Sequence, residues 1–222
     1  MIYLPKSQPA PPCLEEEKDK ASGTYNCEGV LERLKMDFHN KCYICEDKEP
    51  HSINTEHFKP KERYQNLIFE WNNLFYSCSH CNNIKLAKPI YDDILNCTIE
   101  DEEVDKKIKY HLNPYPREQA VISANEDSQR VHNTVHLLLA VYNGTTEMKT
   151  IESGNLRSKL LSEIRRFQDL LFEYDDDLYN ADEKEKVKEK IIRELRPGSN
   201  FTAFKRWILR EHRIGEDFKE YL

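Results

Sequence analysis

The sequence has no apolar run that approaches the roughly 18 residues needed to span a bilayer. Its first residues, MIYLPKSQPAPPC, contain no hydrophobic stretch typical of a secretory signal. Charged residues make up 33% of the chain. We therefore expect a soluble, cytoplasmic protein. With 222 residues, the chain is long enough for one hydrophobic core, or for one core and a small subdomain.

The cysteines do not have the pattern of a disulfide framework. There are seven, an odd number, and four of them form two Cys-x-x-Cys pairs. This usage predicts a reducing compartment and thiolates that bind a metal. Cys13, Cys27 and Cys97 have no partner at metal-ligand spacing, and we interpret them as ordinary small residues.

The chain also lacks the positive net charge of most nucleic-acid-binding proteins, because its formal charge is -7. Its acidic residues are concentrated in short runs, at 15–17, 92–93, 100–103 and 175–177. Basic residues gather near 59–88, 157–166 and 205–213. Such runs are usually solvated faces. Their separation nevertheless leaves room for a basic cleft, and it suggests that tight binding of nucleic acid needs a second protein.

The two Cys-x-x-Cys pairs are Cys42 with Cys45 and Cys78 with Cys81. Each pair places two thiolates on one tight turn, and two such turns complete the tetrahedron that Zn²⁺ prefers. A site with four cysteines is coordinatively full, so the zinc is predicted to be structural. His80 lies inside the second pair and could replace a cysteine, but we expect it at the surface.

Between and after these pairs the sequence predicts a strand, a returning strand and a helix. Residues 51–58 are rich in β-branched and aromatic side chains, and Pro60 ends the strand. Residues 66–77 form the predicted return, and a short helix is expected from Asn82 to Lys88. The predicted fold class is α+β, with this ββα unit and two zinc knuckles embedded in a mostly helical protein.

The motif Glu56-His57-x-x-Pro60, Asn73-Leu74 and Cys78-x-x-Cys81-Asn82-x-x-Lys85 resembles the four-cysteine branch of the HNH, or ββα-metal, nucleases. The resemblance implies that His57 is the general base, that Asn73 anchors its loop and orients it, and that Asn82 and Glu56 bind a catalytic divalent metal. Asp is commoner than Glu at the position of Glu56. Asn72 competes with Asn73, but Asn73 matches the family register.

The chemistry of phosphodiester hydrolysis agrees with these roles. A histidine with a pKa near neutrality can activate water. A hard cation such as Mg²⁺ or Mn²⁺ on oxygen ligands can stabilise the phosphate and the leaving group. We take Lys59, Lys61 and Lys85 as candidate substrate-binding residues. The alternative is that His57 is a structural histidine, and its register with Asn73, Asn82 and the cysteines argues against it.

Outside this motif the chain divides into a proline-bearing arm with two helices (1–40), the nuclease core (41–90) and a mainly helical region (91–222). The prolines of residues 1–12 predict an extended arm, either packed on the protein or available to a partner. Asn26 is the expected cap of a helix that ends at Phe38. Residues 90–125 are expected to be irregular, with a turn at 113–116.

From residue 126 onward, apolar stripes predict helices. One ends at Asn143-Gly144, one is capped by Ser153 or Asn155, one spans about 182–195, and a last one carries Trp207. His132 and His136 have the spacing of metal ligands, but there is no third ligand in register, so we expect them to pack or to make polar contacts.

This layout of arm, four-cysteine core and helical C-terminal half is similar to the nuclease subunits of Septu anti-phage defence systems, which also accompany retrons. The resemblance implies a complex with an ABC-type ATPase, PtuA, with or without a retron reverse transcriptase. We therefore predict an endonuclease that cleaves DNA in phage defence. Two alternatives are the same site acting on RNA, such as tRNA, and a non-catalytic zinc module used for binding.

Overall fold

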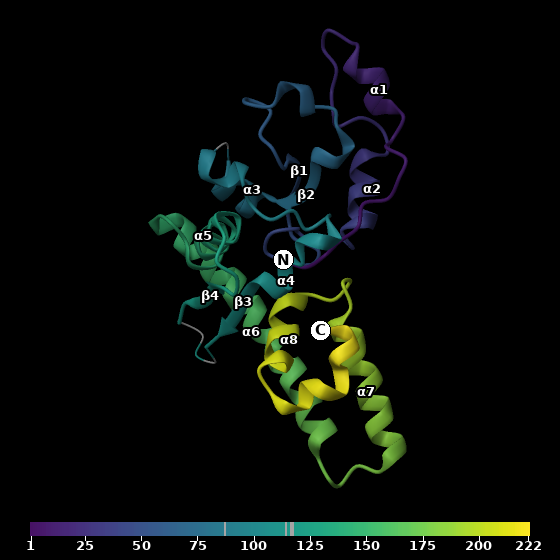
Figure 1. Cartoon of the computed structure of the whole chain (residues 1–222), viewed down its shortest axis with the longest axis vertical. Coiled ribbons are helices and arrows are strands. Elements are labelled where there is room, and N and C mark those ends of the chain that lie inside the picture. The colour runs from purple at the N-terminus through teal and green to yellow at the C-terminus, as the bar shows by residue number, and fades with distance from the viewer. Residues whose placement is uncertain (87, 114, 116–117) are drawn as a thin grey trace.

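The computed structural model describes residues 1–86, 88–113, 115 and 118–222, and combines helices with two small antiparallel sheets (Figure 1). The first sheet pairs β1 (Ile53–His57) with β2 (Leu74–Cys78), and α3 (Ser79–Lys85) follows directly. Ile53 lies opposite Cys78 and His57 lies opposite Leu74. The prediction of a mixed helix and sheet fold is confirmed, and its strand, strand, helix order is present.

Two boundaries in this hairpin differ from the prediction. The returning strand begins only at Leu74, because Trp71–Asn73 form a 3₁₀ turn. Helix α3 begins at Ser79, three residues before the predicted start at Asn82. Its N-cap is Cys78, whose sulfur accepts a hydrogen bond from the Cys81 amide at 3.5 Å. A cysteine can fill this role because its sulfur accepts the N–H that a capping oxygen would otherwise satisfy.

The N-terminal arm is part of the core. Met1, Ile2 and Leu4 are buried, and the Leu4 amide donates to the Cys97 carbonyl at 2.8 Å. Further along, the Trp71 indole donates to the Ser7 carbonyl at 2.9 Å. The arm therefore packs on the protein, as the first of the two interpretations expected.

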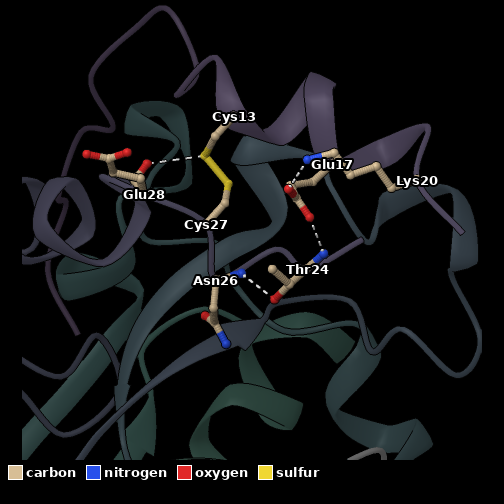
Figure 2. The surroundings of a disulfide bond; sticks show 7 residues. All are labelled: Cys13, Glu17, Lys20, Thr24, Asn26, Cys27 and Glu28. Carbon is tan, nitrogen blue, oxygen red and sulfur yellow. Dashed lines mark hydrogen bonds and ion pairs between the residues drawn. A yellow bond between two sulfur atoms is a disulfide. The ribbon is translucent and has the colours of Figure 1, made fainter. Parts of the chain in front are cut away.

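The interpretation of Cys13 and Cys27 as ordinary small residues was wrong, because they form a disulfide with their Cα atoms 6.0 Å apart (Figure 2). Helix α1 (Cys13–Lys18) and the turns after it reverse the chain, so that residues 14 positions apart meet. Nothing in the spacing alone encodes that reversal. Helix α2 (Val30–Asp37) then begins after Gly29, whose φ is 81°, and not at the predicted cap Asn26.

Residues 90–125 are more ordered than predicted. They contain α4 (Val104–Lys107) and a hairpin of β3 (Ile108–Leu112) and β4 (Ala120–Ala124). Burial alternates along β3, with Ile108 and Tyr110 inside, and this run is too short for a strong period-two signal. The predicted turn at 113–116 includes residues 114 and 116, which lie outside the described residues.

Four helices form the rest of the chain: α5 (Gln129–Asn143), α6 (Glu147–Asp175), α7 (Ala181–Leu195) and α8 (Thr202–Arg210), followed by a 3₁₀ segment at Arg213–Tyr221. Helix α6 begins at Glu147 under a Thr146 cap, so the predicted caps Ser153 and Asn155 were wrong. In Figure 1, α6, α7 and α8 lie at the end of the molecule away from β1 and β2. Among the described residues, no helix is long and apolar enough to cross a membrane.

A buried charge cluster joins the turn that carries Cys42 and Cys45 to the C-terminal helices. The Glu46 carboxylate lies 2.9 Å from the Met1 ammonium and 3.3 Å from Lys41 Nζ, and it accepts the Ala203 amide at 3.2 Å. Lys41 also donates to the Pro197 carbonyl and to Thr202 Oγ1, at 2.9 and 3.1 Å. Burial lowers the pKa of Lys41 to about 8 against the opposing charge of Glu46. For Glu46 the two ammonium groups outweigh burial and lower its pKa to about 2.

Candidate active site and metal centre

Cys42, Cys45, Cys78 and Cys81 come together as predicted from the spacing. All four are buried, and their sulfur atoms lie within 4.8 Å of one another. Cys45 Sγ and Cys78 Sγ are 3.9 Å apart, close to the spacing of about 3.8 Å that a tetrahedron with Zn–S bonds of about 2.3 Å requires. The cluster could therefore hold a zinc ion, and these four thiols fit that ion in number, type and spacing.

The surroundings of the cluster also suit a metal. Burial raises the pKa of the Cys45 and Cys81 thiols. For Cys42, hydrogen bonds from the other three thiols outweigh burial and lower the pKa. Metal binding must then displace protons that burial retains. The Tyr142 hydroxyl donates to the Cys45 carbonyl at 2.6 Å, so α5 supports the first knuckle.

His80 belongs to neither the metal cluster nor the open surface. Its side chain is 15% exposed. Nδ1 lies 2.6 Å from a Glu152 carboxylate oxygen, and Nε2 donates to the Val141 carbonyl at 2.9 Å. His80 therefore ties α3 to α5 and α6, and the expectation of a surface position was only partly met.

Glu56 is buried near the end of β1 and has one bound and one free carboxylate oxygen. Oε1 forms an ion pair with Lys85 Nζ at 2.7 Å. Oε2 is buried and has no hydrogen-bond partner among the residues that the structure describes. An unpaired buried carboxylate oxygen is costly, and a hard cation would satisfy it. This oxygen is the observation that fits a divalent metal at Glu56.

Lys85 does not lie where a substrate-binding residue is expected. Its side chain is 2% exposed, and besides Glu56 it donates to the carbonyls of His57 and Phe58 at 3.1 and 3.0 Å. These partners use all three ammonium protons. Lys85 therefore holds the end of β1 and one oxygen of Glu56, and the prediction that it contacts substrate is not supported by this geometry.

His57 follows Glu56 and is also buried, at 8% exposure. Its Nε2 lies 3.0 Å from the Ile68 carbonyl oxygen. A carbonyl only accepts, so Nε2 carries the proton and the neutral ring keeps a lone pair on Nδ1. Burial lowers the pKa of His57, and the hydrogen bond to Ile68 opposes this in part.

Asn73 and Asn72 have different surroundings. Asn73 is buried and accepts the Lys59 amide at 2.7 Å, while its Nδ2 donates to the carbonyls of Lys59 and Leu67. It therefore closes the loop after His57 onto the start of β2. Asn72 is exposed and accepts a hydrogen bond from Gln8. The contacts of Asn73 are those expected of a loop anchor.

A cavity of about 240 Å³ gathers most of the predicted catalytic residues. Glu56, His57 and Asn82 line it together with Lys61, and Tyr25 closes one side. The Asn82 side chain forms no hydrogen bond with any described residue, so its amide is available to a ligand. Lys59 is not among the lining residues, and its ammonium donates to the Asp92 carbonyl. Of the three predicted lysines, only Lys61 is both exposed and beside the cavity.

Tyr25 was missed from the sequence. Its ring lies edge to face with the His57 imidazole, with centroids 4.5 Å apart and planes at 72°. The two residues are 32 positions apart along the chain, and no local pattern links them. His132 and His136 behave as expected: His132 contacts Asp127, and His136 contacts the Tyr91 hydroxyl.

Comparison with known proteins finds a short stretch of similarity. The chain is 47% identical over 49 residues to the Septu protein PtuB of Bacillus thuringiensis. That match covers 21% of this chain and 19% of PtuB. No protein-family model matches the chain. The similarity to a Septu protein is therefore real but confined to a short segment, and it comes with a cysteine cluster able to bind zinc.

Proposed function

We propose that this protein is a metal-dependent HNH endonuclease that hydrolyses phosphodiester bonds of DNA. The observation that carries the proposal is the shared cavity of Glu56, His57 and Asn82, in which the buried Oε2 of Glu56 has no partner among the described residues. A carboxylate, an amide and a proton-accepting imidazole around one small space are the groups that metal-assisted hydrolysis requires.

In the proposed mechanism, His57 Nδ1 takes a proton from the attacking water. The bond from Nε2 to Ile68 fixes both the tautomer and the ring plane, and the lowered pKa keeps the ring neutral near pH 7. Glu56 Oε2 and the Asn82 amide would hold Mg²⁺ or Mn²⁺. When bound, such an ion supplies charge stabilisation for the phosphate oxygens and the leaving alkoxide.

Two residues keep this arrangement in place. Asn73 binds both backbone groups of Lys59, so the loop that follows His57 cannot swing away without losing these bonds. Lys85 holds Oε1 of Glu56 and leaves Oε2 for the metal. Lys61 at the cavity edge would attract a phosphate group. The four-cysteine zinc has no open position, so its proposed role is to fix the ends of the hairpin.

We further propose that the nuclease works within an anti-phage defence complex with an ABC-type ATPase, with or without a retron reverse transcriptase. The short similarity to the Septu protein PtuB supports this. The net charge of -7 supports it as well, because an acidic protein gains affinity for nucleic acid by joining a partner that supplies positive surface. The region 91–222 is the proposed docking and substrate-positioning part.

The test compares Asn82→Ala with Asn83→Ala. Both asparagines lie on α3, but Asn83 is exposed and does not line the cavity. With Mg²⁺ or Mn²⁺, alone and with the ATPase, we expect Asn82→Ala to lower cleavage of plasmid DNA by at least about tenfold through weaker metal binding. Asn83→Ala should cleave as the wild type does. Titration with Mn²⁺ should show that Asn82→Ala needs more metal.

Total cellular RNA, including tRNA, is the parallel substrate. Loss of RNA cleavage alone in Asn82→Ala would assign the site to RNA instead of DNA. Equal cleavage by Asn82→Ala and Asn83→Ala would contradict the assigned site. A zinc-loaded wild type that cleaves neither substrate, with or without the ATPase, would favour the non-catalytic zinc module.

The rate of cleavage should rise with pH and then level off. His57 acts as a base only when neutral, so the rate is low below the pKa of His57 and maximal above it. Because burial lowers the pKa of His57 below its usual value, the midpoint is expected below about 6.5. Initial rates at saturating Mg²⁺ between about pH 5 and pH 9 would measure this. A midpoint well above that value would contradict a neutral, buried base.

A further inference from the structure

The segment between Cys13 and Cys27 is held largely by bonds within itself (Figure 2). The Thr24 amide donates to the Glu17 carboxylate at 2.9 Å, the Asn26 amide donates to Thr24 Oγ1 at 3.2 Å, and the Gly23 amide donates to the Lys20 carbonyl at 3.2 Å. The disulfide closes these turns into a loop. The loop is therefore a small unit whose shape depends on that covalent bond.

The loop is attached to the rest of the chain through Leu14, which is buried in the hydrophobic core, and through a few contacts with the hairpin region. One exposed ion pair joins Lys18 to Glu70 at 3.5 Å. At the cavity, the contact of the loop is Tyr25, which packs its ring against His57 and has Lys61 Nζ 5.7 Å from its centroid. Tyr25 stands two residues before Cys27, so the disulfide restrains the backbone that carries the ring. The closed loop is thus one of the restraints on the position of Tyr25 over the cavity.

The His57 ring has one polar and one aromatic partner among the contacts of its buried side chain. Nε2 is fixed by Ile68, and Tyr25 is the only aromatic ring among the described residues that contacts it. An edge-to-face contact of this kind favours one ring orientation. A base must hold its lone pair within hydrogen-bond reach of the attacking water. Tyr25 therefore lies where it can keep the lone pair of His57 Nδ1 directed at the attacking water.

We propose that Tyr25 is a positioning residue for His57, that the Cys13–Cys27 disulfide holds it there, and that reduction of this bond lowers nuclease activity. The inference rests on the proposed nuclease function and adds a regulation of the same site. Regulatory disulfides occur in otherwise reducing compartments, so one disulfide beside a cluster of metal-binding thiols is consistent with a redox-sensing role.

The proposed natural reductant of the disulfide is a dithiol. Its thiolate attacks one sulfur of the bond, the other sulfur leaves and takes a proton, and the second thiol of the reductant resolves the mixed disulfide. The protein gains two electrons and two protons, and the dithiol becomes a disulfide. Cys13 Sγ lies 3.2 Å from the Glu28 carbonyl oxygen. After reduction this thiol can donate to that oxygen, so both redox states have a partner for Cys13.

The experiment uses the full chain and four variants: Tyr25→Ala, Tyr25→Phe, the double variant Cys13→Ser with Cys27→Ser, and Tyr115→Ala as an exposed tyrosine control. A trialkylphosphine serves as the reductant. It passes two electrons to the disulfide and becomes the phosphine oxide, with oxygen and two protons taken from water. Zinc content is measured throughout, so that loss of metal is not mistaken for loss of positioning.

Tyr25→Ala, the double variant and reduced wild type should each lose about 3- to 10-fold in kcat, the effect of one lost aromatic pair, with KM little changed. The reductant should have no further effect on Tyr25→Ala or on the double variant. Tyr25→Phe and Tyr115→Ala should behave as the wild type. The His57 imidazole resonance in NMR, assigned with His57→Gln, should lose the ring-current shift of Tyr25 on reduction and in Tyr25→Ala.

Three outcomes would overturn the inference. The His57 resonance could stay unchanged when Tyr25 or the disulfide is removed. The reductant could lower kcat as much in Tyr25→Ala as in wild type, so that the disulfide acts by another route. Activity could rise in Tyr25→Ala, which would make Tyr25 a cover and not a support. If no cleavage occurs at all, the nuclease proposal fails, and the NMR shift alone still decides whether the disulfide and Tyr25 position His57.

Discussion

Replacing His57 by alanine should lower the rate constant of phosphodiester cleavage by about 10²- to 10⁴-fold, the usual contribution of a general base. Among the residues that line the cavity, His57 alone offers a neutral, proton-accepting nitrogen, because Nε2 is committed to Ile68 and Nδ1 is left free. The measurement is a single-turnover rate at saturating Mg²⁺. His132→Ala is the matched control, since His132 is half exposed and its side chain hydrogen-bonds to Asp127, away from the cavity.

Zinc content and thermal unfolding of both histidine variants should match the wild type. A folded, zinc-loaded His57→Ala that cleaves within about threefold of wild type would remove His57 as the base, because that is far below the expected effect. Equal losses in His57→Ala and His132→Ala would point to a shared effect on folding or to a contaminating nuclease.

Replacing Cys81 by alanine should release the zinc and unfold the hairpin region. Structural zinc contributes about 10–16 kcal/mol to the folding of small zinc domains. Whole domains are stable by only about 5–15 kcal/mol. Cys81 is fully buried and also donates its amide to Cys78. We expect less than one equivalent of zinc by elemental analysis and a lowered unfolding temperature.

Cys97→Ala is the control for this variant. Cys97 is as buried as Cys81, and burial raises its pKa to about 12, but it lies outside the metal cluster. Its replacement should retain full zinc and most of the stability. If Cys81→Ala kept its zinc and its unfolding temperature, the zinc would be bound elsewhere and the four cysteines would be a packed thiol cluster.

The local parts of the site could be predicted from the sequence, because short-range spacing encodes them. The hairpin between the two Cys-x-x-Cys turns brings the four cysteines together. Glu56 and His57 are neighbours along the chain at the end of one strand. The early start of α3 could not be predicted, since it depends on Cys78 acting as a cap. Capping by a cysteine sulfur has no common sequence signal.

The long-range contacts of the site needed the structure. Lys85 was expected at the substrate, yet its ammonium lies against Glu56 of β1. Tyr25 lies in the disulfide loop and packs against His57, although the two are far apart along the chain. Composition and periodicity describe one element at a time, so they do not reveal which side chain of a loop will meet a distant strand.

The charge cluster around Glu46 has a consequence for attempts to divide the chain. Lys41 and Glu46 belong to the first zinc knuckle, but several of their partners are backbone and hydroxyl groups of the α7–α8 connection and the start of α8. A fragment ending near residue 90 would leave two ionised groups without these partners. The hairpin with the four cysteines is thus not expected to fold in another protein from its sequence motif alone. A fragment that keeps these contacts must include the C-terminal helices.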